Sequence, residues 1–183
     1  MAPGRYEARL SVNGRTYKQT FQVTMDPRVK TSAEGIVAQR DLGLQILDAM
    51  AVAYAANAQV ADVRAALAAA GEGEEVKTLA GKAAGFGGAP VGRGGRGGGG
   101  GFGRGGGGPT TNFTTIDGTF GSLMTTVEQA DEPPTIAVRE NFQEACKSLT
   151  EALTKWEELK KNDLTALKIA GPPAITAPSG CGQ

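Results

Sequence analysis

The sequence contains no histidine and only two cysteines, Cys146 and Cys181, among its 183 residues. Without histidine there is no Ser-His-Asp triad, no Cys-His pair, no imidazole general base and little scope for a zinc site. Two cysteines are too few for a disulfide scaffold. No apolar run approaches the roughly 18 residues of a membrane-spanning helix. We therefore predict no catalytic, cofactor-binding or metal-binding residues, no cofactor and no membrane span.

A net charge of one sign is also lacking, because 19 basic residues balance 19 acidic ones. The overall charge therefore gives no reason to expect nucleic acid or a membrane surface as a partner. The charge is unevenly placed, however. Five basic residues and no acidic one lie between Val76 and Ile116: Lys77, Lys82, Arg93, Arg96 and Arg104.

The first 28 residues have the pattern of a β-hairpin. Apolar residues alternate with polar ones from Tyr6 to Val12 and again from Tyr17 to Met25, the period of a half-buried strand. Asn13-Gly14 between them is typical of a type I′ turn. We predict a hairpin over about 5–25. A lone hairpin is marginal in water, so its apolar face needs cover from the helices or from a sheet outside this chain.

Residues 29–170 have the periodicity of an antiparallel helical bundle. Thr31 to Glu34 form a capping-box pattern at the start of a long helix, 32–70, which Gly71 ends. Further helices are predicted over about 74–83, 114–130 and 135–161. In the long helix one apolar stripe consists of Leu42, Ile46, Ala49, Met50, Ala53, Ala56, Val60, Val63 and Leu67. A second consists of Leu44, Leu47, Ala51 and Tyr54, which predicts a helix contacted on two sides.

Glycine dominates the segment 85–108, which holds 16 of the 28 glycines of the chain. Such a composition buries too little apolar surface to offset the entropy of ordering the backbone. We predict a disordered loop over 85–109, inserted within one bundle, and a disordered tail over 171–183. The fold class is therefore α+β and mostly α.

The same glycine-rich segment is the strongest candidate for a ligand-binding function. Arg93, Arg96, Phe102 and Arg104 lie in an Arg-Gly-Gly context, which is typical of weak, salt-sensitive binding to single-stranded RNA. The simpler interpretation is a flexible insertion kept soluble by arginine, because the flanking helices offer no nucleic-acid-binding fold. Nucleic acid is therefore not the partner we expect.

Carboxylates and thiols have simple structural interpretations. Glycosidase chemistry would need two carboxyl groups close together, one of them with a raised pKa. Two groups of carboxylates lie along single sides of the predicted helices: Asp41, Asp48 and Asp62, and Glu140, Glu144 and Glu151. Their polar neighbours indicate solvated faces. Cys146 is predicted to be a small buried hydrophobe and Cys181 an exposed, oxidisable thiol. A disulfide between the two is the alternative, which no sequence pattern supports.

Several short motifs, in order, resemble a known family. They are Pro-Gly-Arg-Tyr-Glu-Ala-Arg-Leu (3–10), Asn-Gly-Arg-Thr-Tyr (13–17), Met-Asp-Pro-Arg-Val (25–29), Phe-Gly-Ser-Leu (120–123), Glu-Gln-Ala-Asp-Glu-Pro-Pro-Thr (128–135) and Lys-Trp-Glu-Glu-Leu-Lys-Lys-Asn-Asp-Leu (155–164). Together they resemble the C-terminal region of bacterial sortilin-like, BNR-repeat β-propeller proteins, often labelled glycosyl hydrolases. The resemblance covers residues 2–168 and rests on turns, caps and helix ends.

The resemblance implies that the hairpin is the end of an Ig-like sandwich and that a helical hairpin with a Gly-rich insertion follows. It carries over no catalytic residue, since any propeller chemistry would lie before Met1. It also implies a periplasmic or secreted parent protein. Residues 1–5 lead directly into a strand pattern, so we expect no signal peptide in this chain and a start that is a truncation.

The leading functional hypothesis is a non-catalytic structural or interaction module that contacts an upstream domain or a protein partner through the hairpin. The alternatives are an RNA-binding adaptor and a fragment of a glycoside hydrolase whose catalytic site lies upstream.

Overall fold

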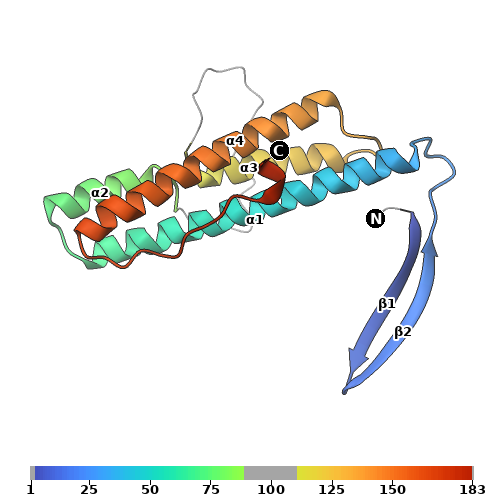
Figure 1. Ribbon diagram of the computed structural model, residues 1–183, viewed down its shortest axis with the longest axis horizontal. Coiled ribbons are helices and arrows are strands. Elements are labelled where there is room, and N and C mark those ends of the chain that lie inside the picture. The colour runs from blue at the N-terminus through green and yellow to red at the C-terminus, as the bar shows by residue number, and fades with distance from the viewer. Residues whose placement is uncertain (1–2, 89–110, 183) are drawn as a thin grey trace.

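The computed structural model describes residues 3–88 and 111–182. An antiparallel hairpin precedes four helices that pack lengthwise against one another, as Figure 1 shows. The predicted mostly helical α+β fold with an N-terminal hairpin is confirmed. The prediction of disorder for 85–109 falls largely on residues 89–110, which lie outside the described residues.

The hairpin consists of β1 (Gly4–Val12) and β2 (Arg15–Val23). Asn13 and Gly14 between them have φ of 50° and 73°, the left-handed conformations that a type I′ turn requires. The turn predicted from Asn-Gly is therefore present. It fixes a register in which Leu10 lies opposite Tyr17.

The long helix α1 spans Ala33–Ala69, and its N-cap is Ser32, whose hydroxyl accepts a hydrogen bond from the Gly35 amide. The predicted capping box is therefore displaced by one residue. Thr31 has a different role, since its hydroxyl donates to the carbonyl of Asp131 and joins the start of α1 to the loop before the last helix. Past the C-terminal end, Gly71 has a φ of +110°, which glycine adopts without steric cost.

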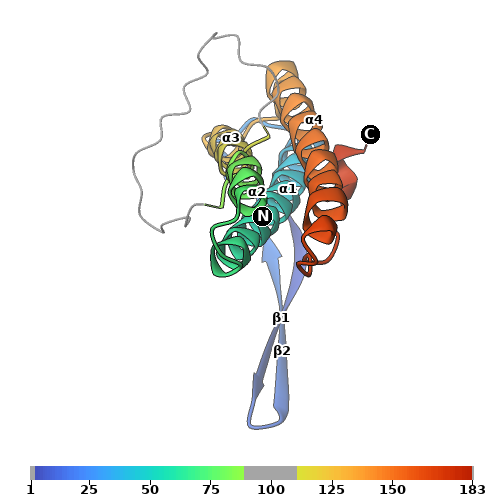
Figure 2. The same cartoon turned by 90° about the vertical axis from the view of Figure 1, so that its left-hand side faces the viewer.

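Three further helices complete the bundle: α2 (Glu74–Ala84), α3 (Phe113–Glu128) and α4 (Ile136–Leu159). Asn112 caps α3, and Thr135 caps α4 as its position after two prolines predicts. A single π-helical turn, Lys160–Leu164, continues α4. Figure 2 looks along the bundle and shows α1, α3 and α4 side by side, with the hairpin extending away from them.

The core lies between the four helices, with α2 contributing Leu79 and Ala83. The first predicted stripe of α1 is buried apart from Met50, which is partly buried. Large aromatic side chains of the other helices fill the centre, with the Phe120 and Phe142 rings 6.0 Å apart. The second stripe was predicted to be covered, and this is wrong: Leu44, Leu47 and Tyr54 are exposed by 53, 51 and 58%.

The glycine-rich segment begins inside the core. The Phe86 ring is buried and lies 5.3 Å from the Trp156 ring. The Phe86 carbonyl also accepts a hydrogen bond of 2.8 Å from the Phe113 amide. Residues 85–88 are therefore ordered, in contrast to the predicted loop boundary at 85.

Asn57 of α1 holds both ends of the segment. Its buried side-chain oxygen accepts from the Gly88 amide at 2.7 Å and from the Thr114 hydroxyl at 3.0 Å. Gly88 has a φ of +79°, and a Cβ there would lie 2.9 Å from Val60, so a side chain does not fit. The chain thus leaves and re-enters the bundle at one place on α1.

Because both sides of this segment contribute to one core, cutting it should not separate them. We expect a chain with a site-specific protease sequence inserted between residues 96 and 100 to elute from a sizing column as one species after cleavage. Cys146 and Cys181 both lie in the second half, so no disulfide would hold the halves together. Elution as two separate peptides would contradict a shared core.

The tail was predicted to be disordered from residue 171, and the structure differs. Residues 171–182 lie along α1 and α4. The buried Lys160 ammonium contacts the Glu157 carboxylate at 2.8 Å and donates to the Pro173 carbonyl at 3.0 Å and to Gln59 Oε1 at 3.2 Å. Buried polar groups must be paired, and here the tail supplies partners for the lysine.

A disulfide between Cys146 and Cys181 attaches the end of the tail to α4. Cys146 is buried as predicted, but it is not free and Cys181 is not an exposed thiol, so the alternative of a disulfide is correct. Nearby, the Ile175 amide donates to the Glu157 carboxylate. The partly buried side chains of Ile175 and Ala177 pack on the core, so apolar contact, hydrogen bonds and one covalent bond hold the tail.

Candidate functional site: the exposed hairpin

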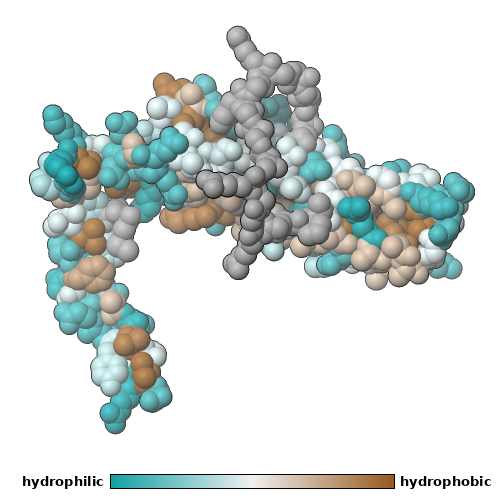
Figure 3. Space-filling view, turned by 180° about the vertical axis from the view of Figure 1, so that it is seen from behind, coloured by the Kyte–Doolittle hydropathy of each residue, from teal (hydrophilic) through white to brown (hydrophobic). Residues whose placement is uncertain are grey.

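One face of the hairpin carries most of its apolar residues, with Arg15 and Gln19 among them, and the other face carries charged and polar residues. In the register of the two strands, Tyr6 faces Phe21 and Leu10 faces Tyr17 on the apolar side. The Tyr6 and Phe21 rings stack with centroids 5.9 Å apart. Leu10 and Tyr17 remain 62 and 57% exposed. Figure 3 shows brown, hydrophobic patches along the hairpin.

The opposite face is held together by polar contacts. Glu7 forms ion pairs with Arg9 at 3.1 Å and with Lys18 at 3.6 Å, and the hydroxyls of Ser11 and Thr16 hydrogen bond at 3.2 Å. Exposed pairs of this kind contribute little stability each. They do mark this side as the one that faces water, so the apolar face is the side that a partner would cover.

The edges of the hairpin are unpaired. Among the described residues, β1 and β2 form a sheet of two strands and pair only with each other. Each nine-residue strand therefore presents backbone N–H and C=O groups along its outer side. Such an edge is a template for a further strand.

A short polar link connects the hairpin to α1. The Arg28 guanidinium binds the Asp26 carboxylate at 2.6 Å and the Arg28 amide donates to it as well. These hydrogen bonds hold the pKa of Asp26 below its usual value. β2 ends at Val23, before this link begins, so the hairpin is joined to the bundle by a turn and not by a continuous element.

The carboxylates that the sequence singled out do not form an acid–base pair. Asp41, Asp48 and Asp62 lie exposed on α1; on α4, Glu140 and Glu144 are exposed and Glu151 is partly buried. Burial raises the pKa of a different carboxyl, Asp117 of α3. In the described residues, no group of three or more Cys, Asp or Glu side chains is placed to hold a metal ion.

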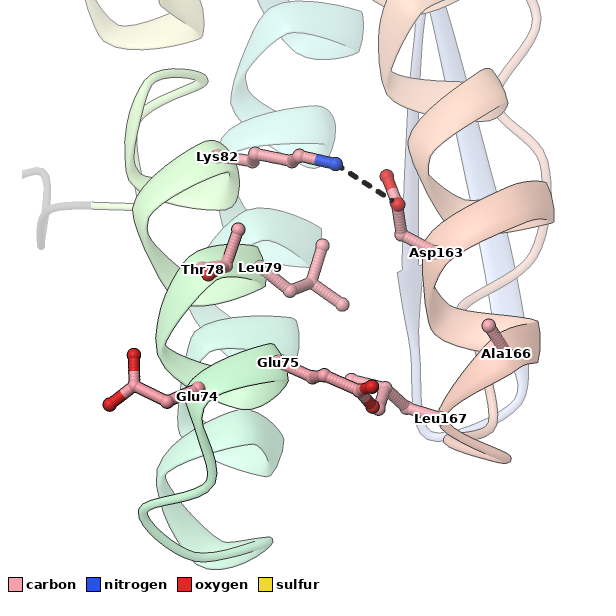
Figure 4. Close-up of a pocket in the computed structure, with 8 residues that line it drawn as sticks. All are labelled: Glu74, Glu75, Thr78, Leu79, Lys82, Asp163, Ala166 and Leu167. Atoms are coloured by element: carbon pink, nitrogen blue, oxygen red, sulfur yellow. Dashed lines mark hydrogen bonds and ion pairs between the residues drawn. The ribbon is translucent and has the colours of Figure 1, made fainter.

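A groove of about 370 Å³ lies between α2 and the end of α4, as Figure 4 shows. Lys82 and Asp163 form an ion pair of 3.1 Å across it, above the apolar side chains of Leu79 and Leu167. Glu74 points away from the groove. The Asp163 carboxylate in this groove is therefore already paired with the Lys82 ammonium.

The predicted RNA contacts Arg93, Arg96, Phe102 and Arg104 lie outside the described residues, so their arrangement adds nothing to that hypothesis.

Among the described helices, none combines the length and apolarity that crossing a bilayer requires. Sequence reasoning also misjudged the second apolar stripe of α1, because periodicity shows which side of a helix is apolar and not whether that side is covered.

Comparison of the chain with protein-family models, with curated proteins and with solved structures finds no match.

Proposed function

We propose that this chain is a non-catalytic interaction module whose hairpin docks on a β-sheet of a larger protein. The observation that carries the proposal is the hairpin's bare apolar face, with Leu10 and Tyr17 more than half exposed. A two-stranded ribbon of this kind is marginal alone. Packing on a second sheet would bury the apolar face, and pairing at an edge would satisfy the free backbone groups.

The docking sheet is proposed to belong to an upstream domain of the same protein, of the sortilin-like, BNR-repeat propeller type that the motifs resemble. The helical bundle would then be a rigid unit that closes the C-terminal end. The Cys146–Cys181 disulfide fits an oxidising compartment, as a periplasmic or secreted parent protein would provide.

The first test is to read the genomic DNA upstream of the Met1 codon. We expect an open reading frame in phase with this chain that encodes alternating apolar and polar segments of strand length. A stop codon in phase, preceded by no such segment, would refute the upstream-domain part of the proposal.

The second test is co-expression of that upstream segment and this chain as two polypeptides. We expect the two to co-purify, and Leu10→Thr/Tyr17→Thr to abolish co-purification, since threonine keeps strand propensity but removes the apolar face. Ile136→Thr on α4, where the side chain is 76% exposed, is the control and should co-purify normally. Co-purification that survives the hairpin variant would show that another surface binds.

A further inference from the structure

The exposed stripe of α1 has the spacing of a coiled-coil seam. Val37, Arg40, Leu44, Leu47, Ala51 and Tyr54 follow one another at alternating steps of three and four residues. The core residues of the same helix, such as Ile46 and Ala53, are fully buried on the other side. Alternate spacing of three and four is what a second helix needs in order to pack its side chains between those of the first.

This stripe borders a groove between α1 and α3. The groove has a volume of about 410 Å³, and its apolar lining includes Leu44, Leu47, Met124 and Val127. At one end the Gln39 amide donates to the Val127 and Ala130 carbonyls at 2.6 and 2.7 Å, which fixes the end of α3 against α1. The two helices that line the groove are therefore held in place relative to each other.

The rim of this α1–α3 groove is acidic. Glu128 and Asp131 line it on the α3 side, and Asp41 and Asp48 lie exposed on α1 beside the seam. Arg40 is the basic residue among the described groove-lining side chains, and its guanidinium is held by Asp41 at 2.6 Å. The uncompensated charge around the apolar floor is therefore negative.

These observations select the kind of partner. A second copy that packed its own seam here would bring Asp41 and Asp48 against the same acidic rim, and like charges at a seam disfavour that pairing. A strand would not match alternating steps of three and four residues. The seam from Val37 to Tyr54 is about 26 Å long at 1.5 Å per residue, which corresponds to two to three heptads of a partner helix.

We propose that the α1–α3 groove binds a basic amphipathic helix of another protein. The apolar residues of that helix occupy the floor at Leu44, Leu47 and Met124, and its Lys or Arg side chains lie over the carboxylates of Asp48 and Glu128. This is the helix-in-groove mode of recognition. It is independent of the hairpin and of the sheet proposed to dock there.

The test uses the full chain and two labelled peptides of about three heptads, both with leucine at the a and d positions. One carries lysine and the other glutamate at e and g, and binding is followed by fluorescence anisotropy. We expect the lysine peptide to bind at least about tenfold more tightly, with an affinity that falls as salt rises. Equal binding of the two peptides would overturn the proposal.

Paired variants locate the site. Leu44→Ser/Leu47→Ser replaces exposed side chains, so the fold is retained, and should weaken binding of the lysine peptide by about tenfold or more. Asp48→Asn/Glu128→Gln should weaken it and flatten the salt dependence. Glu140→Gln/Glu144→Gln on the exposed face of α4 removes the same charge and should change binding less than about twofold. An equal loss of affinity for the lysine peptide in both charge variants would indicate non-specific electrostatic attraction and would refute the assignment of the site to this groove.

The same experiments also test two other possible occupants of the α1–α3 groove, a second copy of the chain and the chain's own hairpin. If sedimentation shows that the chain self-associates and that Leu44→Ser/Leu47→Ser abolishes this, a second copy covers the groove and the proposal is wrong. If Leu10→Ser/Tyr17→Ser raises peptide affinity, the hairpin competes for the groove, and the assignment to a foreign helix also fails. Unchanged affinity in the hairpin variant, with a monomeric chain, supports the proposal.

Discussion

Trp156→Ala is expected to destabilise the bundle by about 3–5 kcal/mol, the cost of removing a large aromatic side chain from a core. Trp156 is fully buried, and its ring lies against Phe86. Its indole N–H donates to Gln59 Oε1 at 3.3 Å. The substitution therefore leaves a cavity where the start of the glycine-rich segment, α1 and α4 meet. Since whole domains are stable by only about 5–15 kcal/mol, this loss removes a large share of the free energy of unfolding.

Urea unfolding followed by circular dichroism measures this loss. Ile136→Ala is the control, because Ile136 is large, apolar and 76% exposed on α4. Its effect should stay within about 0.5 kcal/mol. A Trp156→Ala variant that unfolds at the same urea concentration as the control would show that the core is not centred on this residue.

Reduction of the Cys146–Cys181 disulfide is expected to lower the free energy of unfolding by about 3–4 kcal/mol. The bond joins residues 35 apart, and in the chain-entropy account a loop of that size gives a stabilisation of this order. The released tail would also withdraw the Pro173 carbonyl from the buried Lys160 ammonium. Both effects act in the same direction.

Urea unfolding with and without dithiothreitol measures the effect, and thiol titration in denaturant should find no free thiol before reduction. Cys146→Ala/Cys181→Ala is the control, since a reductant cannot act on it. We expect its stability to match that of the reduced wild-type chain to within about 1 kcal/mol. A wild-type protein indifferent to reductant would contradict the disulfide.

Local sequence patterns predicted the helices and the hairpin because their causes are local. Asn13-Gly14 sets the turn, Thr135 caps α4, and the buried stripe of α1 follows the helical period. Tertiary features were not accessible in the same way. The tail has no periodicity, and it is ordered by contacts with Lys160, just after α4, and with Cys146 of α4. The tail reaches these two residues only in the folded chain.

Two other differences have physical reasons. The average composition of the glycine-rich segment did not indicate that one of its aromatic residues, Phe86, is buried in the core. The stripe of Leu44 and Leu47 predicted burial, because periodicity reports amphipathic character whether a partner is inside the chain or outside it. The apolar face of the hairpin could be predicted from the alternation of apolar and polar residues along the strands. That pattern could not show whether another part of the chain packs on this face.

The central claim is that the hairpin is a docking element without cover in this chain. Hydrogen–deuterium exchange of the isolated protein tests it most directly, because protection follows local stability. The account predicts that backbone amides of β1 and β2 exchange at least about a hundredfold faster than those of the buried turns of α1, α3 and α4, and slow down when the upstream segment is added. Hairpin amides already protected like those of α1 in the isolated chain would contradict it.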